Sequence, residues 1–121
     1  LASARILLES GDVDGACNRA SYAMFGAARS ALLSSQPEGA QNARTHSGLI
    51  GAFSLHLVKS GRVPVDLGKA LNRVAEIRFV ADYTENEVEP AKARWAVEQA
   101  ESFVAEIRAR FPADARPDAN H

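Results

Sequence analysis

The sequence predicts an all-α fold, an up-and-down helical bundle of about five helices. Along most of the chain, apolar side chains recur three or four residues apart, the spacing of one face of an α-helix. Capping residues and Gly or Pro breaks separate these segments, and no stretch has the alternation of a strand. With 121 residues, 46% of them hydrophobic and 24% charged, the chain suits a single domain. We expect the bundle over residues 1–111 and a flexible tail over 112–121.

The N-terminal part predicts two helices. Leu1–Glu9 has the pattern of the last turns of a first helix, which Ser10–Asp12 would end. Either Asp12 or Asp14 is expected to cap a second helix over Val13–Leu33. One ridge of this second helix is made of alanines, which let another helix approach closely. Another ridge combines aromatic and polar groups, namely Asn18, Tyr22, Phe25, Arg29 and Leu32. A helix with two such ridges is central in a bundle or lies at a dimer seam.

A polar segment and a third helix follow. Ser34–Arg44 contains Pro and Gly among polar residues, so we expect it to be a mobile loop where a partner could be met. Thr45 is expected to cap a third helix, and Gly61 to end it. Its apolar face consists of Leu49, Ile50, Phe53 and Leu57.

The last two helices frame an acidic connection. Asp66 is expected to cap a fourth helix over Leu67–Tyr83, and Thr84–Glu89 would connect it to a fifth helix. Pro90 suits the first turn of that fifth helix, because its missing N–H would have no helical partner there. The apolar face of the fifth helix continues as far as Phe111 and is typical of core.

One ion pair in the fourth helix lies where apolar side chains are expected. At about 100° per residue, the stripe formed by Leu67, Leu71 and Val74 continues onto Arg78 and close to Asp82. Arg78 and Asp82 are four residues apart, so they can form a salt bridge on one face of the helix. Because such a pair is costly to desolvate, it should be either a structural bridge in a helix interface or part of a site.

Composition narrows the classes of function. The formal net charge of −1 and the pI of about 6.3 argue against a protein that binds nucleic acid mainly through bulk positive charge. Cys17 is the only cysteine, which excludes an intrachain disulfide, a thiol redox pair and a cysteine-rich zinc site. A reducing, cytoplasmic setting is therefore expected. No apolar run approaches the roughly 20 residues that span a bilayer, so no membrane association is predicted.

Common site motifs are missing from the chain. It has no GxGxxG, GxxxxGK[ST], HExxH or GxSxG sequence, and we predict no cofactor and no bound metal. His56 has no second ligand at helical spacing and is interpreted as a surface histidine. His46 lies in the first turn of the third helix, where the positive end of the helix dipole favours a neutral imidazole that can act as a base. Helping to cap its helix is an equally good interpretation of His46.

Four stretches, in order and with suitable gaps, resemble the HEPN family: Asn18–Phe25 followed by Ala27–Arg29, Thr45–Gly48 with Phe53, Arg78–Tyr83, and Ala100–Val104. The resemblance is to its small, stand-alone bacterial and archaeal branch. It implies a four-helix core, a first helix longer than the one seen here, and a homodimer. It also implies kinship with partners of minimal nucleotidyltransferases in toxin–antitoxin pairs.

The resemblance also implies site residues. HEPN ribonucleases use an Arg followed after four to six residues by a His, generally without metal, in a cleft completed by two subunits. Arg78 matches the Arg, but the His is absent, and Tyr83 lies among the residues in its place. Because tyrosine is a poor base near neutrality, losing the imidazole would cost on the order of 10²–10⁴ in rate. His46 is then the candidate replacement base, and Tyr83 also resembles the tyrosine that accepts AMP in the toxin pairs.

Three functions follow from these residues. The first is a module that binds nucleotide or RNA and pairs with a minimal nucleotidyltransferase, with Arg78, Asp82 and Tyr83 at its site and Asn18 and Tyr22 beside them. The second is a catalytically degraded HEPN protein whose function is structural or dimerising. The third is a metal-independent ribonuclease that uses His46 or Tyr83. We follow the first interpretation.

Overall fold

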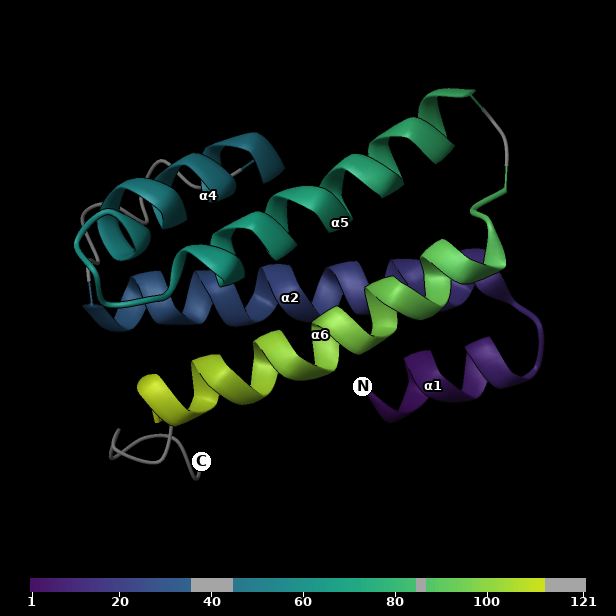
Figure 1. Ribbon diagram of the computed structural model, residues 1–121, viewed down its shortest axis with the longest axis horizontal. Coiled ribbons are helices and arrows are strands. Elements are labelled where there is room, and N and C mark those ends of the chain that lie inside the picture. The colour runs from purple at the N-terminus through teal and green to yellow at the C-terminus, as the bar shows by residue number, and fades with distance from the viewer. Residues whose placement is uncertain (36–44, 85–86, 113–121) are drawn as a thin grey trace.

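The chain folds into an all-α bundle in the computed structural model, which describes residues 1–35, 45–84 and 87–112 (Figure 1). The five α-helices of the described part are α1 (Ala2–Glu9), α2 (Val13–Ser35), α4 (His46–Phe53), α5 (Val65–Thr84) and α6 (Pro90–Arg110). A short π-helix over Ser54–Val58 continues α4. The predicted all-α class with about five helices is therefore confirmed.

The long helix α2 is the element on which the others pack. It contacts α1, α4, α5 and α6, and its contact with α6 is the most extensive in the molecule. In Figure 1, α2 and α6 run in the same direction while α1 and α5 run in the opposite one, so the four alternate along the chain. The shorter α4 lies beside α5 on the side away from α6.

A single hydrophobic core lies between these helices. Its largest fully buried side chains include Met24 of α2, Phe53 of α4, Leu71 of α5 and Phe103 of α6. The rings of Phe53 and Phe103 pack with their centroids 5.6 Å apart and join α4 to α6. Burying aromatic rings of this size contributes several kcal/mol, so this pair helps to fix how the helices pack.

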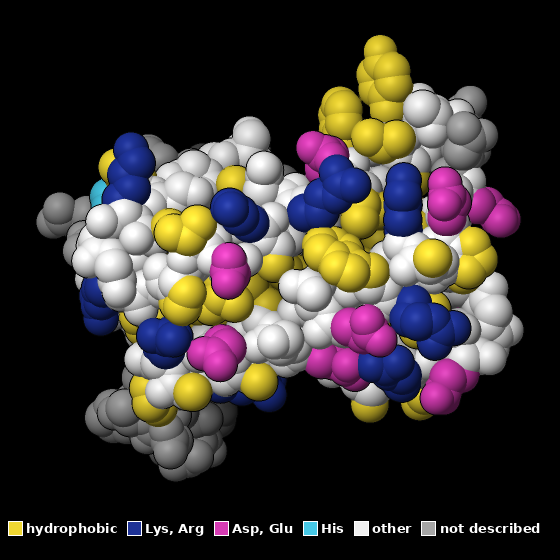
Figure 2. Space-filling model, in the orientation of Figure 1, with side chains coloured by type: hydrophobic (Ala, Val, Ile, Leu, Met, Phe, Trp, Pro, Cys, Tyr) yellow, Lys and Arg dark blue, Asp and Glu magenta, His cyan; other side chains and the backbone are white. Residues whose placement is uncertain are grey.

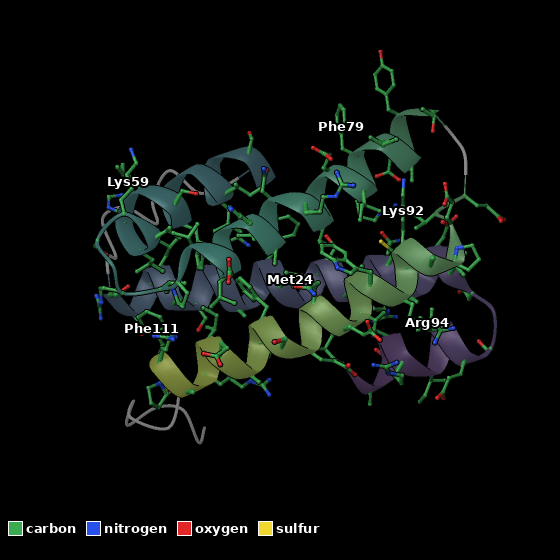
Figure 3. The ribbon with its side chains drawn as sticks, in the orientation of Figure 1. Met24, Lys59, Phe79, Lys92, Arg94 and Phe111 are labelled. Carbon is green, nitrogen blue, oxygen red and sulfur yellow. The ribbon has the colours of Figure 1, made fainter. Side chains whose placement is uncertain are left out.

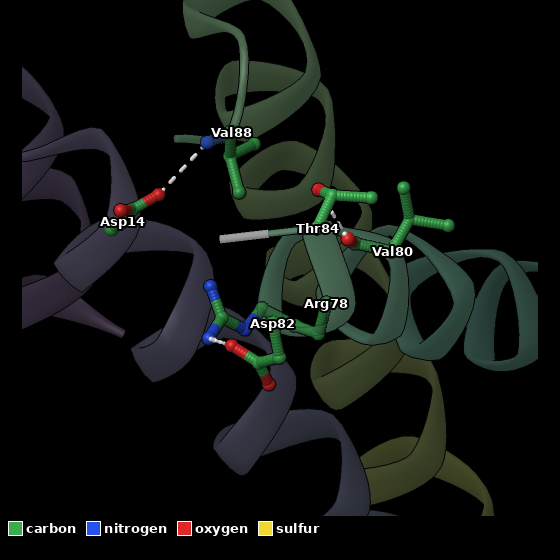
Figure 4. Close-up of polar contacts among 6 residues, drawn as sticks. All are labelled: Asp14, Arg78, Val80, Asp82, Thr84 and Val88. Carbon is green, nitrogen blue, oxygen red and sulfur yellow. Dashed lines mark hydrogen bonds and ion pairs between the residues drawn. The ribbon is translucent and has the colours of Figure 1, made fainter. Parts of the chain in front are cut away.

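The two aspartates at the start of α2 have different roles. Asp12 Oδ1 accepts a hydrogen bond from the Gly15 amide at 2.9 Å, so Asp12 is the residue that caps α2. Asp14 Oδ1 instead accepts from the Val88 amide at 2.9 Å and ties α2 to the segment that leads into α6 (Figure 4). The chain enters this cap through Gly11, whose φ of +92° is a conformation that glycine adopts without strain.

The third predicted helix starts and ends where expected, but it is not a continuous α-helix. The Thr45 hydroxyl accepts a hydrogen bond from the Gly48 amide at 3.0 Å, as expected of a cap. Gly61, with φ of +83°, ends the segment. Between them the α-helix gives way to a π-helix, in which the Lys59 amide donates to the Ser54 carbonyl at 2.9 Å. No local signal marks this change, since a π-helix depends on what the wider turn packs against.

The fourth predicted helix begins earlier than its expected cap. α5 starts at Val65, so Asp66 lies within the first turn instead of preceding the helix. Pro64 causes this shift, because its fixed φ starts a helix readily. Asp66 still faces the positive end of the helix dipole, which favours an acidic side chain there.

Two of the expected flexible segments fall largely outside the described residues. The predicted loop Ser34–Arg44 shares Ser34 and Ser35 with the end of α2, and its residues 36–44 are not described. The same holds for residues 113–121 of the predicted tail and for 85–86 of the acidic connection. Among the helices that are described, none is both long and apolar enough to cross a membrane.

Candidate functional site

A groove of about 610 Å³ runs between α2, α4 and α5 and is the candidate site. We refer to it as the Arg78 groove. Its lining is partly apolar, but three helices also place polar side chains along it: Asn18 and Arg29 from α2, Ser47 from α4, and Asn72, Glu76, Arg78 and Asp82 from α5. A largely apolar groove with a few convergent polar groups is the usual form of a ligand site.

Arg78 and Asp82 form the predicted ion pair, but only the arginine is withdrawn from solvent. Arg78 Nη2 donates to Asp82 Oδ1 at 2.5 Å (Figure 4). The Arg78 side chain is 16% exposed, whereas that of Asp82 is 67% exposed. The expectation of a desolvated pair on the apolar stripe is therefore wrong for Asp82. Its carboxylate reaches out to water instead of being enclosed with the guanidinium.

The packing of α5 explains this difference. Its buried face follows Leu67, Leu71, Val74 and Ile77, so Ile77 and not Arg78 continues the apolar stripe. Arg78 lies at the edge of that face and Asp82 beyond it. Figure 1 also shows the C-terminal end of α5 diverging from α2, so the last turn has less protein around it.

The inner side of Arg78 lies near Cys17, the fully buried thiol of α2. Burial raises the pKa of the Cys17 thiol, because the thiolate would lose its hydration. The positive charge of Arg78 acts in the opposite direction on the same pKa, because it favours the thiolate. Arg78 is thus mostly withdrawn from solvent while its carboxylate partner is exposed.

Most of the predicted binding residues do meet in this groove. Asn18 and Tyr22 line it from α2, opposite Arg78 and Asp82 on α5. Tyr22 is 82% exposed, so its ring covers little of the protein and is accessible. Four of the five residues of the ridge predicted on the second helix therefore line the α2 wall of the groove, and Leu32 is instead buried in the core.

Tyr83 and His46 are placed differently from these four. Tyr83 is 79% exposed and does not line the groove; its ring stacks on Phe79, with centroids 5.7 Å apart and planes inclined by 27°. His46 is the first residue of α4, directly before the groove residue Ser47, but its side chain is outside the described part of the structure.

Sequence reasoning missed the other groove residues of α5. Asn72, Glu76 and Phe79 lie on the same side of this helix as Asp82, at spacings of three and four residues. Phe79 is 66% exposed, and Figure 3 shows its ring standing away from the bundle. Hydrophobic side chains project there beside charged ones over the C-terminal end of α5 (Figure 2). Stepping three or four residues toward the N-terminus from Asp82 would have identified these residues in the sequence.

The charged groups of the groove are paired with neighbours. Glu76 forms a salt bridge with Arg73 of the same helix, and Asp82 forms one with Arg78. The described residues contain no group of three or more His, Cys, Asp or Glu side chains placed to hold a metal ion. The chemistry that these described side chains offer is therefore anion recognition by arginine, amide hydrogen bonding and aromatic stacking.

Comparison with known proteins identifies relatives of the whole bundle. Residues 1–110 match the family model of the HEPN domain. A protein of Methanocaldococcus jannaschii named "Putative toxin" is 32% identical over 89% of this chain and 78% of its own length. A UPF0332 protein of Thermotoga maritima is 35% identical over 86% of this chain and 76% of its own length.

A UPF0332 protein of Gloeobacter violaceus is 35% identical over 69% of this chain, and the match spans 63% of that relative. No solved structure matches the chain.

Proposed function

The chain belongs to the HEPN domain family, and we propose that it is a toxin-like HEPN module that binds nucleotide or RNA in the Arg78 groove. One observation carries the proposal. Two arginines, Arg29 of α2 and Arg78 of α5, line a single groove together with the amides of Asn18 and Asn72. Guanidinium groups bind phosphate, and amide side chains hydrogen-bond to sugars and base edges.

The aromatic side chains supply the second part of the recognition. Tyr22 and Phe79 both line the groove and are both largely exposed, so a base can stack on either ring without displacing protein atoms. Tyr83 extends the Phe79 surface by one ring. The chain's net charge of −1 fits a local site of this kind better than a broad basic surface.

Partners form part of the same proposal. A second copy of the chain would cover exposed apolar side chains outside the groove, such as Val80. A minimal nucleotidyltransferase is the partner that the HEPN resemblance implies, and a toxin-like relative is consistent with a paired system. Light scattering at several concentrations tests the homodimer. Co-purification with the neighbouring nucleotidyltransferase, if the genome encodes one, tests the pair.

A metal-independent ribonuclease is the second candidate, favoured by the position of α4. Ser47 lines the groove, and His46 directly precedes it as the first residue of α4. The chain lacks a histidine after Arg78, and His46 would have to supply the base. If this candidate is correct, His46→Ala removes cleavage while binding persists.

The deciding experiment measures both binding and cleavage of short unstructured RNAs labelled with fluorescein, in the presence of a chelator. We expect Arg78→Ala to weaken binding by about tenfold or more, because it removes a charge-assisted contact. Arg94→Ala is the matched control. It removes the same charge from an exposed position of α6 that does not line the groove (Figure 3).

Three results can be told apart. Binding that Arg78→Ala weakens and Arg94→Ala does not supports the proposal. Cleavage that depends on Arg78 makes the protein a ribonuclease. Equal behaviour of the wild type and Arg78→Ala, with the dimer intact, contradicts the proposal and leaves a structural, dimerising HEPN protein.

A further inference from the structure

Arg78 is anchored, whereas the carboxylate that it contacts is not. The Arg78 side chain is 16% exposed and lies in the groove between α2 and α5, so moving it would displace protein atoms around it. Asp82, at 67% exposed, can turn into water by rotating its own side chain. Rotation of an exposed carboxylate has little desolvation cost, because both orientations are hydrated.

The contact itself is a minimal one. A single nitrogen, Arg78 Nη2, bonds a single oxygen, Asp82 Oδ1. Arg5 and Glu101 provide the comparison within the same molecule, because Nε and Nη2 of Arg5 donate to the two carboxylate oxygens of Glu101. A guanidinium favours two parallel bonds to one anion, so the Asp82 contact satisfies Arg78 less completely than a phosphate would.

The other carboxylate of the groove has a different partner. Glu76 is bridged to Arg73, which does not line the groove. Among the described residues, Asp82 is therefore the groove carboxylate that competes directly for the Arg78 guanidinium. Glu76 contributes negative charge to the groove without occupying the anion-binding atoms.

We propose that Asp82 is a displaceable counter-ion of Arg78, which occupies the guanidinium in the free protein and sets how strongly the groove binds a phosphate group. This inference rests on the proposed function and adds a residue that determines affinity. A phosphate displaces the Asp82 carboxylate into water and takes its place on Nη2. The ligand then has to overcome both the lost ion pair and the repulsion from the displaced carboxylate.

The test compares Asp82→Asn with Glu76→Gln. Each variant removes one negative charge from the groove and keeps a side chain of nearly the same shape, but only the first removes the competitor of Arg78. With the labelled RNA as the probe, we expect Asp82→Asn to tighten binding about fivefold and Glu76→Gln by less than about twofold. In an Arg78→Ala background, Asp82→Asn should change affinity by less than about twofold.

If both variants tightened binding equally, the gain would come from the lower negative charge of the groove and not from freeing Arg78, which would overturn the inference. No gain from Asp82→Asn, or a gain that persists without Arg78, would do the same. Because Asp82 is exposed, circular dichroism and the unfolding midpoint are expected to be unchanged in Asp82→Asn, which rules out misfolding as the cause.

A second probe separates this inference from the proposed function. Pyrophosphate, followed by its effect on thermal unfolding, reports anion capture without any RNA. If the wild type fails to bind RNA but Asp82→Asn gains affinity for pyrophosphate through Arg78, the proposed RNA function fails and the counter-ion inference stands. If RNA binds through Arg78 and Asp82→Asn gains nothing with either probe, the inference alone is wrong.

Discussion

The core and the C-terminal end of α5 each hold a pair of packed aromatic rings, and the two pairs have opposite surroundings. Phe53 and Phe103 come from α4 and α6, are fully buried and hold two helices together. Phe79 and Tyr83 are one turn apart on α5, lie largely in solvent and connect no two elements. The first pair stabilises the fold. The second contributes little to it and remains available to a ligand or a partner.

Two ion pairs show a similar contrast between contacts that join helices and contacts within one helix. Arg5 and Glu101 are separated by 96 residues and link α1 to α6 with two hydrogen bonds. Arg78 and Asp82 link only successive turns of α5 with one. A contact between distant helices helps to hold the fold together, whereas an exposed contact within one helix can break without unfolding that helix. This difference is consistent with the groove being the candidate site.

The ring pairs predict the largest contrast. Phe103→Ala should lower the free energy of unfolding by about 3–5 kcal/mol, because it leaves a cavity beside Phe53. Phe79→Ala should change it by no more than about 0.5 kcal/mol, since the ring is already in water. Chemical denaturation measures both. A large loss of stability in Phe79→Ala would mean that the exposed pair is structural and would break the comparison.

Two side-chain to backbone hydrogen bonds give a smaller contrast. Asp14→Ala leaves the Val88 amide without its acceptor and should destabilise the protein by about 1–2 kcal/mol, because this bond joins α2 to the start of α6. Thr84→Ala removes a hydroxyl that donates to the Val80 carbonyl inside α5 (Figure 4). We expect it to cost less than about 0.5 kcal/mol. Urea midpoints of the two variants should differ accordingly.

The two ion pairs predict effects on different properties, stability for Arg5–Glu101 and RNA affinity for Arg78–Asp82. Arg5→Gln should lower the thermal midpoint slightly at low salt, with a difference that shrinks as salt screens the pair, and should leave RNA affinity unchanged. Asp82→Asn should leave the midpoint unchanged and alter affinity. Thermal scans at two salt concentrations, combined with RNA titrations, check both. Finding that Arg5→Gln impairs RNA binding would show that α1 contributes to the site.

The last effect concerns Cys17 and appears only in alkaline solution, so it is absent near neutral pH. Burial raises the pKa of this thiol above its ordinary value of 9.0, so above that pH the unfolded chain loses its thiol proton before the folded one. The stability contribution of Cys17 is complete below pH 9.0 and is lost as pH rises toward the folded pKa.

Compared with Cys17→Ala, the wild type should therefore lose stability by up to about 1.4 kcal/mol per pH unit in that range. Urea unfolding at intervals from neutral to alkaline pH measures the difference between the two proteins. A difference that does not change with pH would show that the thiol is not isolated from water behind Arg78.

Local pattern was sufficient for most of the fold. The start of α2, the cap at Thr45, the stop at Gly61 and the first residue of α6 all follow from side chains within a few residues of each boundary. The buried faces of α2 and α6 follow from helical spacing in the same way. The π-helix after Phe53 could not be predicted, since the extra residue in its turn is set by packing.

The sequence by itself determined which helices form, the HEPN family, and the presence of Arg78 and Asp82 on one side of α5. Only the tertiary structure decided that the arginine is held inside and the aspartate outside, and that Asn18 and Arg29 of α2 lie across from them. The reason is physical. Helical spacing depends on neighbours in the chain, whereas the depth of a side chain and its companions from other helices depend on how those helices pack.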